Sequence, residues 1–166
     1  MTTIIFKQGN IFEKCIGIYD LCLYYGHYGM SFGMGYNTLI NKFPILVDFS
    51  EPFGVGPITL DNGKVMVCIQ KDLMSNTELE DDLINRLNYA KFYGLKTIAL
   101  TGVRDSLKVS ITDINIAKEN DNNRVRFIVD VLTKWLKNNN SKIKEILLIA
   151  MSDTYTRNFR EPINVA

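Results

Sequence analysis

The order of apolar and polar positions divides the chain into a strand-rich first half and a second half in which strands alternate with helices. Runs of β-branched and aromatic residues in the first half are typical of pleated strands. These runs cover residues 2–7, 16–24, 45–49, 58–60 and 64–69. The last two flank Asp61-Asn62-Gly63, a turn whose residues tolerate positive φ, so they predict a β-hairpin.

In the second half, two stretches carry apolar residues at a helical period. The first starts at Thr77, with Glu80 in capping-box spacing, and ends at Gly94, a residue type that suits the position just after a helix. The second places apolar residues between 125 and 136 on one face and stops at 138–140. An apolar strand is expected after each helix, over residues 96–101 and 143–151 respectively.

This alternation of strands and helices predicts right-handed crossovers and parallel strand pairing. Strands that are apolar almost throughout are typical of a sheet covered on both faces. The sequence therefore predicts an α/β fold. Ligands of such sheets usually bind beyond the carboxyl ends of the strands, which here are residues 9–10, 101–104 and 151–155.

Length and composition bound the organisation. The chain has 166 residues, 46% of them hydrophobic and 22% charged, which is typical of one globular domain. No linker or internal repeat divides it, so we expect a domain over residues 1–155 and a C-terminal tail over 156–166. A formal net charge of +1 makes nucleic acid an unexpected partner, although it leaves room for a local basic patch.

The same survey predicts where the protein works. No apolar run reaches the roughly 18 residues of a membrane span, and the N-terminus lacks the layout of a signal peptide. Cys15, Cys22 and Cys68 lack the C-x-x-C spacing of a zinc or redox site, which favours free thiols in a reducing compartment. We therefore expect a cytoplasmic protein without membrane contact. Abundant Ile, Asn and Lys with little Arg are typical of an AT-rich genome, which suggests a low-GC bacterium or a phage acting in its host's cytoplasm.

The segment 24–37 (YYGHYGMSFGMGYN) is the most unusual part of the sequence, since glycines alternate there with aromatic residues. A Gly-rich turn that runs into a helix, here expected near 36–43, presents free backbone N–H groups to an anion such as a phosphate. The spacing matches neither Walker A nor G-x-G-x-x-G. The alternative interpretation of this segment is a packed aromatic surface loop. Thr101-Gly102, at the end of a predicted strand, is a second Gly-containing turn that would face the same crevice, and its alternative interpretation is a plain strand-to-helix turn.

His27, the one histidine, lies in this segment and is a candidate general base because imidazole titrates near neutral pH. An ordinary loop histidine is the alternative. No second histidine or ligand pattern accompanies it, so we expect neither a metal nor a cofactor. No serine or cysteine stands in a recognisable nucleophile motif.

Taken in order, these elements resemble the macro domain, an α/β module that binds ADP-ribose. The resemblance runs from about Ile4 to Tyr155 and implies a single three-layer domain, in which a mixed central sheet carries helices on both faces. Four segments carry it: 5–11, similar to the family's opening strand and Gly-Asp-Ile turn; 33–36, similar to its glycine-rich phosphate loop; 56–69, similar to its Gly-x-x-x-Thr strand and the next strand; and 95–103, similar to its strand ending in Ser-Thr-Gly.

The resemblance also implies a set of ligand-binding residues. By position they are Asn10 and Ile11 near the adenine, Gly33, Gly35 and Tyr36 on one side of the diphosphate, Thr101, Gly102 and Val103 on the other side, and Tyr155 flanking the adenine. Beyond what the resemblance implies, we expect Arg104 to add a positive charge beside the phosphates.

Two departures from the family pattern bear on activity. Asn10 replaces the Asp that accepts a hydrogen bond from the adenine amino group, so that bond lacks charge assistance. The family's Asn-Ala-Ala-Asn segment has no counterpart, since residues 24–28 read Tyr-Tyr-Gly-His-Tyr. The leading hypothesis is therefore a module that binds ADP-ribose or a related nucleotide. The alternatives are a ligand-free scaffold that contacts another protein and, more weakly supported, a hydrolase that processes ADP-ribose with help from His27.

Overall fold

The computed structural model describes residues 1–25, 55–69, 75–101 and 114–166, and all structural statements concern these ranges. The strand expected at 45–49 and the helix expected near 36–43 lie outside them. No helix of the described part is long and apolar enough to cross a membrane.

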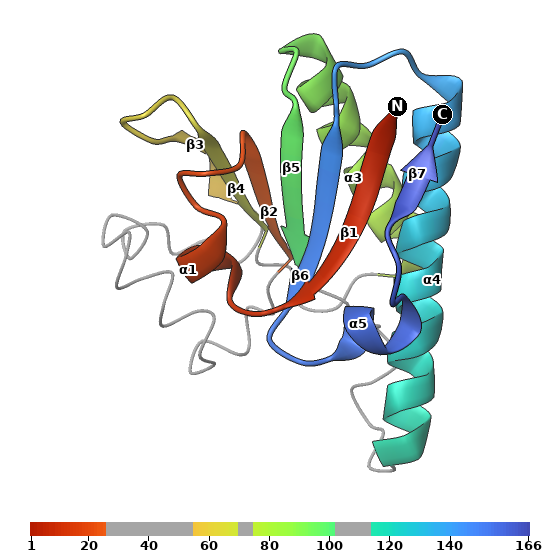
Figure 1. The fold of residues 1–166 in the computed structure, drawn as a ribbon. Coiled ribbons are helices and arrows are strands. Elements are labelled where there is room, and N and C mark those ends of the chain that lie inside the picture. Colours follow the sequence, from red (N-terminus) through yellow and green to blue (C-terminus); the bar gives the residue numbers. More distant parts are fainter. Residues whose placement is uncertain (26–54, 70–74, 102–113) are drawn as a thin grey trace.

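One seven-stranded sheet runs through the described residues in the order β3-β4-β2-β5-β6-β1-β7 (Figure 1). Its strands are β1 (Thr2–Gln8), β2 (Leu21–Tyr25), β3 (Val55–Thr59), β4 (Val65–Ile69), β5 (Thr97–Thr101), β6 (Glu145–Ala150) and β7 (Ile163–Val165). The five inner strands pair in parallel, whereas β3 and β7 lie antiparallel at the two edges. The α/β prediction with a mixed sheet is confirmed.

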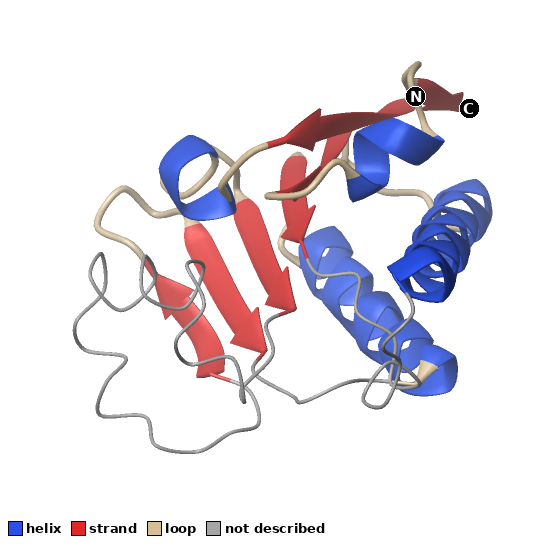
Figure 2. Cartoon of the chain, turned by 90° about the horizontal axis from the view of Figure 1, so that it is seen from below, coloured by secondary structure: helices blue, strands red, loops and turns tan. Residues whose placement is uncertain are grey.

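Helices cover both faces of this sheet (Figure 2). They are α1 (Ile11–Lys14), α3 (Asn76–Phe92), α4 (Ile114–Asn138) and α5 (Thr154–Asn158). Side chains of α3, α4 and α5 belong to one hydrophobic core, and those of α1 belong to a second one. The three-layer architecture is thereby confirmed.

Neighbouring residues of the central strands alternate between the two cores. In β6, Leu148 packs with α3 and α4 while Ile149 packs with α1, and in β5 Leu100 and Ala99 divide in the same way. This follows from strand geometry, which points successive side chains to opposite faces. The side chains on both faces are buried, which explains why residues 98–100 of β5 and 146–150 of β6 are apolar without interruption.

The hairpin prediction is confirmed, since β3 and β4 pair antiparallel around Gly63, whose φ is +82°. The strand predicted over 16–24 is shorter. Gly17 has a φ of +85°, and the amides of Ile18 and Tyr19 donate to the Cys15 carbonyl. These turn contacts occupy the backbone, so β2 begins only at Leu21.

The first long helix begins two residues earlier than predicted. Its N-cap is Ser75, whose hydroxyl accepts from the Glu78 amide, and the Glu78 carboxylate accepts from the Ser75 amide, each at 3.2 Å. The capping box is therefore Ser75 with Glu78, not Thr77 with Glu80, because only Ser75 has the extended backbone of an N-cap. The predicted end is correct: Gly94 follows the helix with a φ of +64°.

Residues 156–166, set apart as a tail in the sequence analysis, are built into the domain. The end of α5 leads to Phe159, whose ring stacks on Phe6 with 4.7 Å between centroids. The chain then forms β7, in which Val165 is buried and pairs with Thr2 of β1. Pairing with an open sheet edge satisfies backbone groups that a free tail would leave to water.

Asp20 ties together three strands at the edge where the parallel strands begin. Its carboxylate accepts from the Lys64 ammonium at 2.5 Å and from the amides of Lys96 and Thr97 at 2.8 and 3.2 Å. Partial burial alone raises the pKa of this carboxyl, but the hydrogen bonds from Lys64 and the two amides outweigh burial and hold the pKa below its usual value.

The capping box gives a first prediction. Replacing Ser75 with Ala removes the acceptor for the Glu78 amide and should lower the free energy of unfolding by about 1 kcal/mol. Thr77→Ala, at the cap expected from sequence, is the matched control and should change it by less than about 0.5 kcal/mol. Urea unfolding of both variants measures the difference. A larger loss in Thr77→Ala would contradict this cap assignment.

The Asp20 cluster gives a second prediction. Asp20→Asn removes the charge that strengthens three hydrogen bonds and should cost about 1–3 kcal/mol of unfolding free energy at pH 7. Because folding lowers the Asp20 pKa, its stabilisation is complete above the unfolded value of about 4 and is lost as pH falls through the lower folded value. The difference in unfolding free energy between the wild type and Asp20→Asn should therefore be smaller at pH 3 than at pH 7. Asp130→Asn, on an exposed part of α4, is the control and should show no such gap at either pH.

Candidate functional site

The five parallel strands of the sheet end at one edge, which we call the carboxyl edge (Figure 1). The strand register sets this alignment, because Gln8 pairs with Ala150 at the ends of β1 and β6, and Tyr24 pairs with Thr101 at the ends of β2 and β5. The described segments that the sequence analysis assigned to a ligand crevice thus meet at a common edge, where ligands of open α/β sheets usually bind.

Gly9 and Asn10 make the tight turn from β1 into α1. The Gly9 amide donates to the Ala150 carbonyl at 2.8 Å, and a side-chain carbon on Gly9 would lie only 3.3 Å from the Ile149 side chain. Asn10 caps α1, since its Oδ1 accepts from the Phe12 amide at 2.9 Å. Asn10 is 6% exposed, so its amide is fixed in place at the end of β1.

Ile11 and Thr101 also lie at the carboxyl edge, since Ile11 follows the β1–α1 turn and Thr101 ends β5. The Ile11 side chain is buried in the hydrophobic core on the α1 face of the sheet, directly after the turn. Thr101 ends β5 half-buried. Seven further predicted site residues lie outside the described residues: His27, Gly33, Gly35, Tyr36, Gly102, Val103 and Arg104.

Tyr155 differs from its expected position beside a ligand. Its side chain is 0% exposed and packs in the core with α3 and α4, because α5 folds onto that face of the sheet. Burial raises the pKa of the phenol well above its usual value, although the nearby Arg124 charge lowers it in part. Within the described residues the Tyr155 hydroxyl has no hydrogen-bond partner. Tyr155 is therefore a core residue here, not an aromatic at the open edge.

Sequence reasoning missed a partly buried polar contact at the carboxyl edge. The Tyr25 hydroxyl, at the end of β2, donates to Asp82 Oδ2 at 2.7 Å, and Asp82 also faces Arg86 at 3.6 Å. Burial, followed by the charge and hydrogen bond of Asp82, raises the pKa of Tyr25. In the sequence, Asp82 is one of several acidic residues near the start of a predicted helix. Nothing in the neighbouring residues indicates that it contacts Tyr25, 57 positions away.

A second such contact joins the two long helices. The guanidinium of Arg124, in α4, donates to Asn76 Oδ1 at 2.5 Å at the start of α3. Arg124 is 3% exposed, although it directly follows a run of polar residues in the sequence, 119–123. Together with the Tyr25 contact, it holds the start of α3 in place below the carboxyl edge.

The described side chains form no metal site, and two of the three cysteines lie in the core. No group of three His, Cys, Asp or Glu side chains among them is arranged to hold a metal. Cys15 and Cys22 are buried and form no disulfide. Burial raises the pKa of the Cys15 thiol to about 11, so it is a protonated core residue at neutral pH.

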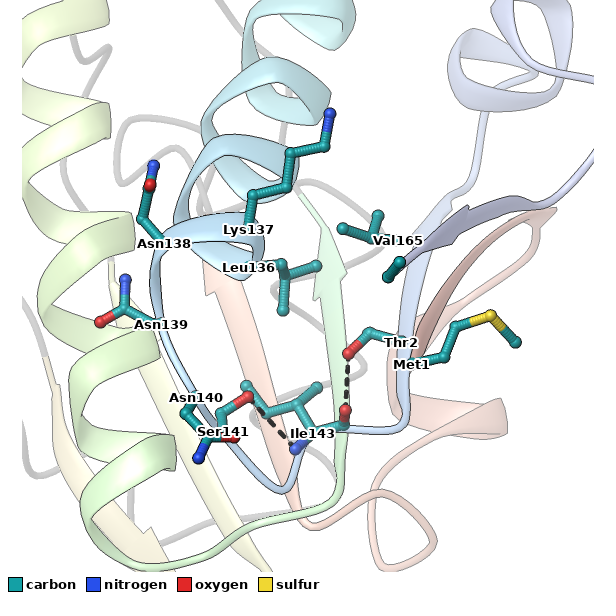
Figure 3. A pocket seen from close by; sticks show the side chains of 11 residues that line it. Met1, Thr2, Leu136, Lys137, Asn138, Asn139, Asn140, Ser141, Ile143 and Val165 are labelled. Carbon is teal, nitrogen blue, oxygen red and sulfur yellow. Dashed lines mark hydrogen bonds between the residues drawn. The ribbon is translucent and has the colours of Figure 1, made fainter.

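Two surface hollows lie at the opposite edge of the sheet, where the strands begin. One of about 390 Å³ is bounded by the end of α4, the polar segment 138–141 and the outer strands (Figure 3). In it the Thr2 hydroxyl donates to the Ile143 carbonyl, and the Ile143 amide donates to the Ser141 hydroxyl. The other, of about 490 Å³, adjoins it on the side of β5. None of the predicted ligand residues lines either hollow.

No protein-family model and no curated protein matches the sequence. Solved structures do match it by fold. The macro domain of ganglioside induced differentiation associated protein 2 superposes with a TM-score of 0.62 at 7% identity, over 95% of this chain and 80% of that one. The macrodomain of Trypanosoma brucei in complex with ADP-ribose gives a TM-score of 0.64 at 13% identity, over 93% and 67%.

The fold likeness extends beyond isolated macro domains. Tomato leucine aminopeptidase matches over 92% of this chain but only 33% of its own, with a TM-score of 0.52 and 11% identity. The chain thus spans about two thirds of the trypanosomal structure and a third of the aminopeptidase. At such low identities the likeness establishes architecture and leaves activity open. The chain has a macro-like fold.

Proposed function

We propose that this chain binds ADP-ribose or a related nucleotide at the carboxyl edge of its sheet. The observation that carries the proposal is the common alignment of the β1, β2, β5 and β6 ends, which brings the Gly9-Asn10 turn and Thr101 to one edge. Support comes from the fold, which is shared with a macrodomain of Trypanosoma brucei that was crystallised with ADP and with ADP-ribose.

In this proposal the adenine lies at the β1–α1 turn. Asn10 is held by its cap on α1, and its amide oxygen has a second lone pair that can accept a hydrogen bond from the adenine amino group. The diphosphate lies between the Gly33–Tyr36 segment and the Thr101–Arg104 segment, where backbone amides bind its oxygens and Arg104 adds a positive charge. Tyr155 is left out of the ligand contacts because it is fully buried.

The primary test is calorimetric titration of the protein with ADP-ribose, with AMP and inorganic phosphate as comparisons. Saturable binding that is selective for ADP-ribose is expected. Gly102→Leu should abolish it, because a side chain there would displace the phosphate-binding backbone, while the midpoint of thermal unfolding stays near that of the wild type. Absence of binding by the wild-type protein would overturn the proposal and favour a scaffold that contacts another protein.

The identity of residue 10 gives a sharper prediction. Asn10→Asp restores a charged acceptor while preserving the cap on α1, because Asp and Asn cap helices equally well. Since charge assistance roughly doubles the strength of such a bond, the affinity for ADP-ribose should rise about fivefold. Asn123→Asp, on an exposed part of α4, is the matched control for the added charge. An equal gain in both variants would contradict the placement of the adenine beside Asn10.

A further inference from the structure

Two segments at the edge opposite the carboxyl edge form a surface that is both basic and aromatic. They are residues 91–96 (KFYGLK), which include the end of α3, and residues 137–144 (KNNNSKIK), which include the end of α4, and we call them together the basic rim. The rim contains five lysines and no acidic residue. All five are exposed: Lys91, Lys96, Lys137, Lys142 and Lys144.

The two segments of the rim are fixed against each other. The Lys144 amide donates to the Lys96 carbonyl at 2.7 Å, and the Lys91 ammonium donates to Asn139 Oδ1 at 3.3 Å. The Lys142 side chain crosses Gly94, its Cδ lying 3.5 Å from where a side-chain carbon on that glycine would stand. The lysines therefore gather on one surface although they are about 50 positions apart in the sequence.

Lysines surround a hollow in the rim. The hollow of about 490 Å³ is lined by Met1, Lys96, Ser141, Lys142, Ile143 and Lys144. No carboxylate lines it. Two acidic residues that neighbour the rim have other partners: Glu145 accepts from the Tyr19 hydroxyl at 2.6 Å, and Asp20 is paired with Lys64. The hollow is thus suited to an anion, such as a phosphate group.

Two aromatic rings stand beside these lysines. Phe92 is 81% exposed and Tyr93 is 60% exposed, and their ring centroids lie 5.0 Å apart. Tyr89 packs against Tyr93 from the last turn of α3, with 4.6 Å between centroids, and fixes the Tyr93 ring from one side. Neighbouring exposed rings on a surface rich in lysine offer flat apolar faces for stacking.

One effect opposes anion binding here, because the C-terminal ends of α3 and α4 carry partial negative charge. Side chains at the helix ends already compensate part of this negative charge. Asn138 and Asn139 donate to the carbonyls of Lys134 and Trp135, each at 2.9 Å, and Lys91 and Lys137 lie in the last turns of the two helices. The Lys96, Lys142 and Lys144 charges beyond the helix ends then leave the rim positive.

We propose that the basic rim binds single-stranded nucleic acid. Phosphates lie along Lys96, Lys142 and Lys144, while bases stack on Phe92 and Tyr93. This combination of a positive surface with exposed aromatic faces is how proteins hold single strands without reading their sequence. An acidic peptide would satisfy the lysines but would leave the rings unused. The site is separate from the proposed nucleotide site, since it lies where the parallel strands begin.

The test is fluorescence anisotropy with a labelled 20-nucleotide oligothymidylate at 50 and 200 mM salt. Binding by the wild-type protein should weaken with salt. Lys142→Glu with Lys144→Glu should weaken binding at least tenfold and reduce the slope of log affinity against log salt by about 1.4, at about 0.7 per phosphate contact. Phe92→Ala with Tyr93→Ala should weaken binding about tenfold but leave that slope unchanged.

Lys118→Glu, on an exposed part of α4 far along the chain from the rim, is a charge-reversal control at a single site and should bind nearly as the wild type does. Circular dichroism of each variant confirms folding, which these exposed substitutions should preserve. The proposal is overturned if 100 µM protein does not shift the anisotropy at 50 mM salt, or if Lys118→Glu loses as much affinity as the rim variants. Displacement of the strand by polyglutamate at equal charge concentration would assign the rim to an acidic protein instead.

Discussion

Parallel pairing of β2 with β5, of β5 with β6 and of β6 with β1 decides what each edge of the sheet carries. Because the five inner strands run the same way, the segments that follow them begin at one edge, and α3 and α4 return the chain to the other edge. The turn holding Asn10 and the end of β5 at Thr101 are brought together by this register alone. Asn10 and Thr101 therefore lie at the same edge although they are 91 positions apart in the sequence.

The same pairing explains why polar contacts concentrate at the two edges. Inside the sheet both faces are buried, so the central strands carry apolar residues on either side. Polar groups that fix one element against another must then sit where the strands begin or end. Asp20 does this at the starting edge, whereas Tyr25 with Asp82, and Arg124 with Asn76, do it at the carboxyl edge. Each is a hydrogen bond to a charged side chain, the kind that contributes most to stability.

Periodicity and turn chemistry in the sequence were sufficient for the α/β class, the hairpin at Gly63 and the helix end at Gly94, because each depends on neighbouring residues. Features decided by distant partners were not predictable. The short strand β7 reads as a tail, since its three residues form a strand only by pairing with β1. Tyr155 follows the last predicted strand and so resembles a residue at the edge, yet α5 turns it into the core. A tertiary contact overrode the local pattern in both cases.

The net charge of the chain does not show how charge is distributed over the folded surface. The total of +1 sums 19 basic and 18 acidic residues, which are unevenly distributed. Along α3, for example, Glu78, Glu80 and Asp82 lie near the start and Lys91 lies in the last turn. The helix dipole favours this sorting at both ends. Since α4 ends at the same edge as α3, its lysines add to those that follow α3, and the positive charges collect in one place (Figure 1). A sum over the chain averages these faces and therefore says little about which partner either edge can bind.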